Sequence, residues 1–182
     1  MPFFKRNLAN KEALFKNRVF GLNINKYQCK NGVSLIGVGG NLGDSKRLFF
    51  KLLIKLKKDA LVRVIATAPI YKNPPFGYAN QPYFYNTLFL IETKLTPMNL
   101  LRYLLHIEKH FGRKRLFANA PRTLDLDILL YNKRKINKGD KLIIPHPHWQ
   151  SRNSVLVPLY YLKEVECLKR VLSHLHHKRL IN

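Results

Sequence analysis

The chain has 182 residues, 46% of them hydrophobic, with 33 Lys and Arg against ten Asp and Glu and a net charge of +23. This length and apolar content predict one folded domain, with or without an appendage, and exclude a disordered chain. No apolar run reaches about 18 residues, which excludes a transmembrane helix. The charge would attract any polyanion and does not distinguish a nucleotide from a nucleic acid.

Residues 1–32 form a basic segment with seven Lys or Arg and one acidic residue. Its Phe and Leu residues follow no clean period, so we expect an extension outside the core fold, with residues 33–182 as the main domain. The start of the segment lacks the apolar stretch of a secretory signal. Cys29 and Cys167 lie far apart without metal-ligand spacing to His, which predicts free thiols and a cytoplasmic protein.

The first half of the main domain is expected to form a strand, a helix and a second strand. Residues 33–39 are a short apolar run typical of a buried strand, and the glycines of 39–43 predict a turn. Apolar side chains then recur every three or four residues, which predicts an amphipathic helix from about residue 44 to 58. A strand over residues 61–71 follows, and the prolines of the next loop end it.

The second half repeats this pattern. Residues 83–92 alternate well enough for a strand, and Thr96 with Pro97 opens a helix that Gly112 ends. A basic loop, 113–122, leads into another apolar strand. The order is β-α-β-β-α-β, which predicts an α+β protein with a ferredoxin-like core and an antiparallel sheet. One sheet face is expected to carry the helices and the other a ligand.

The C-terminal part of the chain is expected to add a short hairpin and helices to this core. The hairpin is predicted around residues 138–140, and helical structure from residue 151 onwards.

Asp125 and Asp127 lie two residues apart inside an apolar run. Alternate side chains of a strand share a face, so the two carboxylates lie together and cannot both enter a dry core without compensation. Mg²⁺ would provide that compensation, because it takes one or two carboxylates and completes its shell with water and phosphates. Arg122 and the basic cluster at 113–115 lie just before the pair, and a metal beside guanidinium groups favours phosphate chemistry. The alternatives are a solvated edge strand and a solvated basic loop.

Seven motifs occur in order along most of the main domain: GGNLG at 39–43, YKNPPFG at 71–77, QPYFYN at 81–86, IE at 107–108, GR at 112–113, PRTLDLDI at 121–128 and PH at 145–146. Together they resemble the bacterial 6-hydroxymethyl-7,8-dihydropterin pyrophosphokinase family of folate biosynthesis. The resemblance covers about residues 33–162. It implies transfer of the β,γ-pyrophosphate of ATP to the hydroxymethyl oxygen of the pterin, with release of AMP.

The resemblance also implies roles for individual residues. Asp125 and Asp127 would hold two Mg²⁺ ions, and the catalytic residues would be Arg113, Arg122, Asp125 and Asp127. ATP would be bound by Glu108, Arg113, Arg115, Arg122, Ile128, His146 and Arg152. The pterin would be bound by Asn73, Pro74, Pro75, Phe76, Phe84 and Asn86. We expect a monomer that acts on these small molecules, without a membrane or a specific nucleic acid as partner.

Several of these residues have simpler interpretations. Phe84 can be an ordinary core aromatic of a strand, and Glu108 a surface charge of a helix. His146 and His148 flank Pro147 in a spacing that can be a chance turn, and Arg152 can be a charge at a helix start.

The chain departs from the family pattern at three places. Asn119 stands where the family has a Trp in the basic loop, and the loop is one residue shorter. Ser154 stands where the family has a second aromatic residue against the pterin, a role that Trp149 or another ring would have to take. The extension 1–32 is also unusual.

Two other functions fit parts of the sequence. A basic ferredoxin-like protein with many aromatic residues can bind RNA without catalysis, but the two carboxylates would repel the phosphates. A decayed family member used only for binding is disfavoured by the presence of Asp125, Asp127, Arg113 and Arg122.

Overall fold

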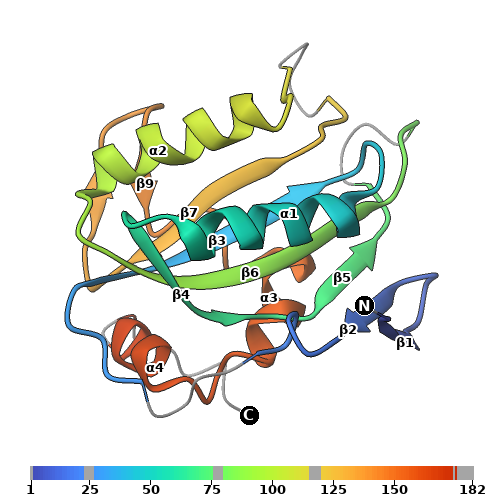
Figure 1. Cartoon of the computed structure of the whole chain (residues 1–182), viewed down its shortest axis with the longest axis horizontal. Helices are drawn as coiled ribbons and strands as arrows, with labels where there is room; N and C mark the ends of the chain where they lie inside the picture. Colours follow the sequence, from blue (N-terminus) through green and yellow to red (C-terminus); the bar gives the residue numbers. More distant parts are fainter. Residues whose placement is uncertain (1, 23–26, 76–79, 115–119, 174, 176–182) are drawn as a thin grey trace.

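A sheet forms the middle layer of the molecule (Figure 1). The structure is a computed structural model, and it describes residues 2–22, 27–75, 80–114, 120–173 and 175. Seven described strands form the sheet: β1 (Phe4–Asn7), β2 (Ala13–Lys16), β3 (Gly32–Gly40), β4 (Val62–Thr67), β5 (Ile70–Asn73), β6 (Phe84–Thr93) and β7 (Asp125–Tyr131). Their order is β1-β2-β5-β6-β3-β7, with β4 also paired to β6.

The predicted β-α-β-β-α-β order is confirmed. Helix α1 (Ser45–Lys58) connects β3 to β4, and helix α2 (Pro97–His110) connects β6 to β7. Strands β4 and β5 correspond to the single predicted strand 61–71, and both pair with β6. All strand pairs of this sheet are antiparallel. The predicted C-terminal hairpin is formed by β8 (Ile136–Asn137) and β9 (Ile143–Ile144).

Local sequence accounts for where the two crossover helices begin. The Asp44 side chain accepts a hydrogen bond from the Arg47 amide at 3.1 Å, which satisfies a free N–H at the start of α1. Thr96 caps α2 in the same way, through the Asn99 amide at 3.3 Å. Pro97 occupies the first turn of α2, where a missing N–H costs nothing.

The sheet separates two hydrophobic clusters. On one face the apolar sides of α1 and α2 pack on alternate residues of β3, β6 and β7. On the other face lie α3 (Asn153–Tyr160) and α4 (Glu166–Leu172), which pack on the remaining residues of β3 and β6. The face that we expected to be left for a ligand is therefore partly covered by the C-terminal helices.

The expectation that the N-terminal segment lies outside the core is wrong for its described part. Strands β1 and β2 form a hairpin that extends the sheet, because β2 pairs with β5. Phe15 and Phe20 are buried in the cluster beneath α1 and α2. Two strands of four residues are too short to show a period, which is why the sequence pattern missed them. The domain boundary near residue 33 stays a prediction.

The prediction of free thiols is also wrong. Cys29 and Cys167 form a disulfide across 138 positions of sequence, with their Cα atoms 6.1 Å apart. It joins the segment before β3 to helix α4. Sequence spacing does not reveal this pairing, because the two residues approach only after α4 packs under the sheet.

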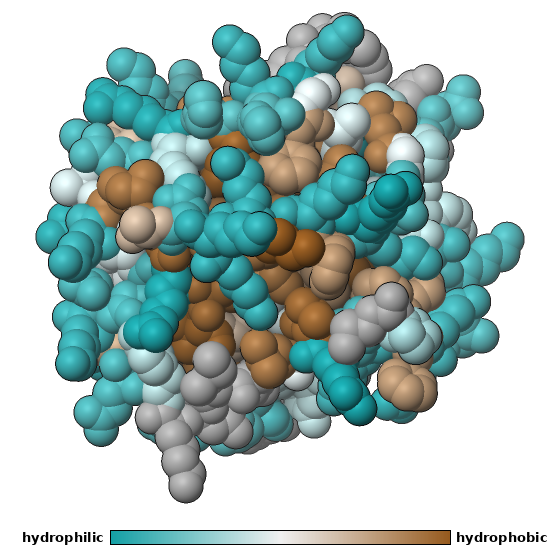
Figure 2. All heavy atoms as spheres, viewed as in Figure 1, coloured by the Kyte–Doolittle hydropathy of each residue, from teal (hydrophilic) through white to brown (hydrophobic). Residues whose placement is uncertain are grey.

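The α1 and α2 face of the molecule has hydrophilic side chains around a central apolar area (Figure 2). Phe50 and Ile54 of α1 and Leu105 of α2 are among the exposed large apolar residues. No helix in the described part of the chain has the length and apolar character needed to cross a membrane.

Candidate active site

Asp125 and Asp127 share one face of β7, as their spacing predicts. Leu126 and Ile128 point to the other face, where they are buried beneath α1 and α2. The two carboxylates therefore lie on the side of the sheet that carries α3. Their Cα atoms are about 7 Å apart, two residues along a strand.

Two guanidinium groups neutralise Asp125. Arg113 Nη1 lies 2.6 Å from Asp125 Oδ1, and Arg122 Nη1 lies 3.0 Å from Asp125 Oδ2. Arg113 also forms an ion pair with Glu108 of α2. Glu108 is buried and accepts a hydrogen bond from the Leu126 amide at 2.7 Å, so it joins α2 to the start of β7. The interpretation of Glu108 as a surface charge is wrong.

Asp127 occupies a different environment from Asp125. None of the described residues forms a hydrogen bond or an ion pair with its carboxylate. Burial raises the pKa of Asp127 to about 7, and the charges of Asp125 and Glu108 act in the same direction. Arg113 and Arg152 oppose this shift. The carboxylate is thus short of positive charge, which a bound cation would supply.

Glycines stand opposite both carboxylates on the neighbouring strand. Gly37 of β3 is in register with Asp127, and Gly39 with Asp125. On its other side Gly39 is in register with Asn86 of β6. A Cβ atom at Gly39 would lie 3.0 Å from the Asn86 side-chain oxygen. Asp125 and Asn86 therefore flank a position without a side chain, about 10 Å apart across two strand spacings.

Asn86 and Asn73 form a polar pair at this end of the sheet. Asn86 Nδ2 donates to Asn73 Oδ1 at 2.7 Å, and Asn73 Nδ2 donates to the Pro74 carbonyl at 2.8 Å. Asn73 is the last residue of β5, and Pro74 and Pro75 follow it directly. Phe76, predicted to contact the pterin, lies outside the described residues.

Arg122 connects the carboxylates to this polar pair. Its guanidinium carbon lies 5.5 Å from the centre of the Phe84 ring, two residues before Asn86 on the same face of β6. Phe84 is half-buried and belongs to neither cluster of the described residues, which contradicts its interpretation as a core aromatic. Arg122 Nε and Thr123 Oγ1 are buried without a hydrogen-bond partner among the described residues. Such atoms indicate a place where a ligand can bind.

Asn41 belongs to the site region, although it is not among the residues predicted to bind ATP or the pterin. It is buried, and its side-chain oxygen accepts from the Arg122 amide at 2.8 Å. Its Nδ2 donates to Gln81 Oε1 at 2.9 Å and to the Pro82 carbonyl at 3.2 Å. Asn41 therefore holds together three loops that lead into α1, β6 and β7. Its position in the GGNLG motif is the signal that could have found it.

His146 and Arg152 lie on the same side as the carboxylates. The His146 amide donates to the Leu129 carbonyl at 2.9 Å, and its Nδ1 accepts from the His148 amide at 3.2 Å. Burial lowers the pKa of His146, and so do Arg152 and His148, whereas Asp125 raises it. A neutral His146 leaves its Nε2–H as a donor. Arg152 is exposed at the start of α3.

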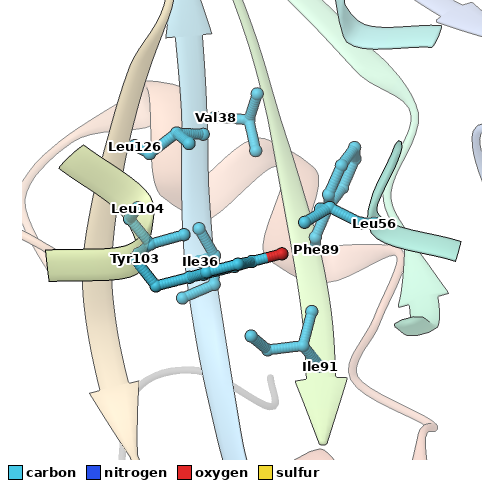
Figure 3. Close-up of a pocket in the computed structure, with 8 residues that line it drawn as sticks. All are labelled: Ile36, Val38, Leu56, Phe89, Ile91, Tyr103, Leu104 and Leu126. Atoms are coloured by element: carbon cyan, nitrogen blue, oxygen red, sulfur yellow. The ribbon is translucent and has the colours of Figure 1, made fainter. Parts of the chain in front are cut away.

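The structure does not bring every predicted residue to this side. The Ile128 side chain is buried on the opposite face, so any contact of Ile128 with ATP would be made by its backbone. Arg115 lies outside the described residues, as does Asn119. A small cavity of about 10 Å³ lies between the sheet and the two crossover helices, walled by apolar side chains and the Tyr103 ring (Figure 3). It is too small and too apolar to be the site.

Comparison with known proteins assigns the sequence to a family. The model of the family described as 7,8-dihydro-6-hydroxymethylpterin-pyrophosphokinase matches residues 35–164. The chain belongs to this family. The match contains Asp125, Asp127 and both arginines of the ion-pair cluster.

Individual relatives agree with the family match. The chain is 41% identical over 127 residues to the 2-amino-4-hydroxy-6-hydroxymethyldihydropteridine pyrophosphokinase of Helicobacter pylori, covering 69% of this chain and 77% of the relative. It is 40% identical over 127 residues to the Campylobacter jejuni protein of the same name, covering 70% and 80%. It is also 35% identical over 157 residues to the folic acid synthesis protein fol1 of Schizosaccharomyces pombe, covering 85% of this chain and 21% of that protein.

One departure from the family pattern can be located in the pyrophosphokinase fold. Ser154, in place of the second pterin-stacking aromatic residue, lies half-buried in the first turn of α3. Trp149 is buried in the cluster beneath α3 and α4. Its packing there argues against Trp149 as the substitute ring.

Proposed function

We propose that the chain carries out its family's reaction on the face of β7 that bears Asp125 and Asp127. The reaction is ATP-dependent transfer of diphosphate to 6-hydroxymethyl-7,8-dihydropterin, which gives the pterin diphosphate and AMP. The observation that carries the assignment is the group formed by two carboxylates and two guanidinium groups opposite Gly37 and Gly39. This group would bind metal-bound phosphates, and it lies next to the residues proposed to bind the flat pterin ring.

We propose that Asp125 and Asp127 hold two Mg²⁺ ions. The donor set fits, because Mg²⁺ needs only one or two protein carboxylates when substrate phosphates and water complete its shell. The raised pKa of Asp127 and its lack of a described partner also fit a cation as its natural neighbour. When bound, the ions would neutralise the charge of the nucleotide phosphates and orient them for transfer.

Arg113 and Arg122 are the proposed phosphate ligands. A guanidinium fork suits two anionic oxygens at once, and both groups already lie beside Asp125. Glu108 orients Arg113, and the remaining ATP ligands would be Arg115, Ile128 through its backbone, His146 and Arg152. His146 would donate its Nε2–H to an oxygen of the nucleotide.

The pterin side is assigned to the ends of β5 and β6. The amides of Asn73 and Asn86 offer donors and acceptors to the ring edge, and Phe84 offers an aromatic face. Pro74, Pro75 and Phe76 would contribute contacts from the following loop. We propose a monomer, because all the assigned residues come from one chain. We also propose that it acts in the cytoplasm, and this rests on the supply of ATP there, since the Cys29–Cys167 disulfide removes the free thiols as an argument.

The direct test is incubation with ATP, Mg²⁺ and 6-hydroxymethyl-7,8-dihydropterin, followed by detection of AMP. Asp125→Ala and Asp127→Ala should each lower AMP release at least about a hundredfold with an unchanged circular dichroism spectrum, because each removes a proposed metal ligand. Asp140→Ala, in the exposed β8–β9 hairpin, is the matched control and should keep full activity. Near-normal AMP release from both site variants would contradict the assignment.

A further inference from the structure

The N-terminal hairpin lies outside the family match, which begins at residue 35, and yet it is part of the sheet. Strand β2 pairs with β5 through Ala13 with Lys72, Leu14 with Tyr71 and Phe15 with Ile70. The other side of β5 pairs with β6. Without the hairpin, β5 would be an edge strand with a row of unpaired backbone groups. The hairpin makes it an interior strand (Figure 1).

Strand β5 leads directly into the proposed pterin side. It ends at Asn73, whose amide oxygen accepts from Asn86, and Pro74 and Pro75 follow. Tyr71 of β5 is in register with Asn86 on one side and with Leu14 on the other. One row of residues therefore runs from the hairpin through β5 to the proposed pterin ligand on β6.

Phe15 packs the hairpin against β6 and α1. Its ring centre is 6.0 Å from that of Tyr85, the residue between Phe84 and Asn86. Lys46, in the first turn of α1, places its Nζ 4.6 Å from the centre of the Phe15 ring and 5.9 Å from that of Tyr85. This contact joins β2, β6 and α1 on the face of β6 opposite to that of Phe84 and Asn86, so it fixes the backbone of β6 between these two residues.

A second contact lies on the opposite face of the hairpin. Tyr71 is fully buried, and the Glu12 side chain lies close to its hydroxyl. Burial raises the pKa of this hydroxyl, and so does the neighbouring Glu12, the one acidic residue of the extension. The hairpin therefore covers Tyr71 on the same row as Asn86.

We propose that the N-terminal hairpin is a positioning element for the pterin substrate, with Phe15 as its central positioning residue. The proposal rests on the proposed function. By pairing with β5 and packing on Tyr85, the hairpin holds Asn73, Phe84 and Asn86 in the geometry that binds the ring. A strand held on both sides loses less freedom when a ligand binds, so the gain is in pterin affinity. ATP binds at the Asp125 end, two strands away from Asn86, and its affinity does not depend on the hairpin.

The test compares Phe15→Ala with Phe20→Ala. Phe20 is buried in the same segment, and its ring packs on Phe89, in the middle of β6, and on Phe3, whose ring also contacts Phe15. Among the described residues no ring contact joins Phe20 to Tyr85, so Phe20 serves as the control. Both variants remove a buried ring and should lower the unfolding temperature. Phe15→Ala should raise KM for the pterin about five- to tenfold and leave KM for ATP within about twofold, while Phe20→Ala should change neither.

Direct titration of 6-hydroxymethyl-7,8-dihydropterin, with a non-hydrolysable ATP analogue present, should show the same loss of affinity. Phe15→Leu keeps an apolar side chain and loses only the ring contacts, so it replaces Phe15→Ala if that variant folds poorly. Its KM for the pterin should rise two- to threefold, by roughly the loss of these contacts. The proposal is overturned if Phe15 variants leave pterin affinity unchanged, if both substrates weaken equally, or if Phe20→Ala has the same effect. Absence of AMP release by the unmodified chain would instead contradict the proposed function.

Discussion

The Asp125 carboxylate forms ion pairs with the guanidinium groups of Arg113 and Arg122, and each guanidinium group has a second partner. Arg113 is paired with Glu108, and the Arg122 guanidinium lies over the Phe84 ring. In the proposed metal-bound site, both arginines would therefore keep an anchor and could turn their remaining N–H groups to phosphate oxygens. Asp127 has no such partner among the described residues, and it is the side chain with the most to gain from a cation.

Arg122→Ala should lower kcat about 10²- to 10³-fold while changing the Kd for ATP less than about threefold, because in its proposed role the guanidinium acts mainly on charge that develops during transfer. Arg122→Lys should recover part of the loss, since it restores charge without the two-pronged geometry. Arg134→Ala, an exposed arginine beyond the other end of β7, is the control for net charge. Full turnover with weakened ATP binding would show that Arg122 only binds the nucleotide.

The raised pKa of Asp127 predicts how the metal-free protein responds to pH. The folded chain keeps a proton on Asp127 up to about pH 7, whereas the unfolded chain releases it near pH 4. The unfolding free energy should therefore fall as the pH rises from about 4 to about 7.

Asp127→Asn should remove this dependence and be more stable than the unmodified chain at pH 8 by roughly 2 kcal/mol. Urea unfolding in the presence of a chelator, at pH 5 and at pH 8, measures this pH dependence. Asp140→Asn, at an exposed position, is the control. An equal response of both proteins to pH would contradict the burial of an uncompensated Asp127.

At the scale of elements, the site depends on how closely the end of β3 approaches the segment before β7. The Asn41 and Leu42 amides both donate to the Arg122 carbonyl, at 2.9 and 3.2 Å. Gly40 lies directly beside this contact, and a Cβ atom there would collide with the Thr123 carbonyl oxygen. Glycine is therefore required at position 40 for a close backbone approach and not for a special turn.

Gly40→Ala should destabilise the fold by about 1–3 kcal/mol and displace Arg122, because the collision is with backbone that cannot rotate away. Gly37→Ala is the matched control on the same strand. Its Cβ would lie 3.5 Å from the Leu129 side chain, an ordinary contact, so stability should change by less than about 1 kcal/mol. Urea titrations measure the unfolding free energy of both variants. Equal values for Gly40→Ala and Gly37→Ala would show that β3 and the Thr123 segment can separate freely.

At the scale of the whole molecule, the C-terminal helices are tied to the start of the core by a covalent link. The Cys29–Cys167 disulfide spans 138 positions, and Tyr27 Oη, close to Cys29, donates to Glu92 of β6 at 2.5 Å. The Lys30 and Asn31 amides donate to the same carboxylate at 2.6 and 2.7 Å. The segment before β3 is therefore fixed to both the sheet and α4.

Replacing both cysteines by Ser should lower the unfolding free energy by about 2–4 kcal/mol, because the link restricts the unfolded chain. Addition of a reductant to the unmodified protein should have nearly the same effect, and it should have none on the double variant. Thiol titration in denaturant should find no free thiol before reduction and two after it. Two free thiols in the unreduced protein would contradict the disulfide.

The sequence alone was sufficient for the core topology and for the shared face of Asp125 and Asp127. These depend on short-range properties, namely the strand and helix periods, the capping residues Asp44 and Thr96, and the prolines after β5. Each of these properties acts within a few residues of the chain, so its effect on local structure does not depend on long-range contacts.

Only the tertiary structure decided which partners meet across the sheet. Strand register places Asp127 beside Gly37, and Asp125 beside Gly39, which in turn lies beside Asn86. The sequence of one strand does not specify this register. The place of the N-terminal hairpin against β5 and the disulfide between Cys29 and Cys167 depend on segments that approach only in the folded chain. Local patterns could not reveal them, because their energy comes from long-range pairing and burial and not from any period along the chain.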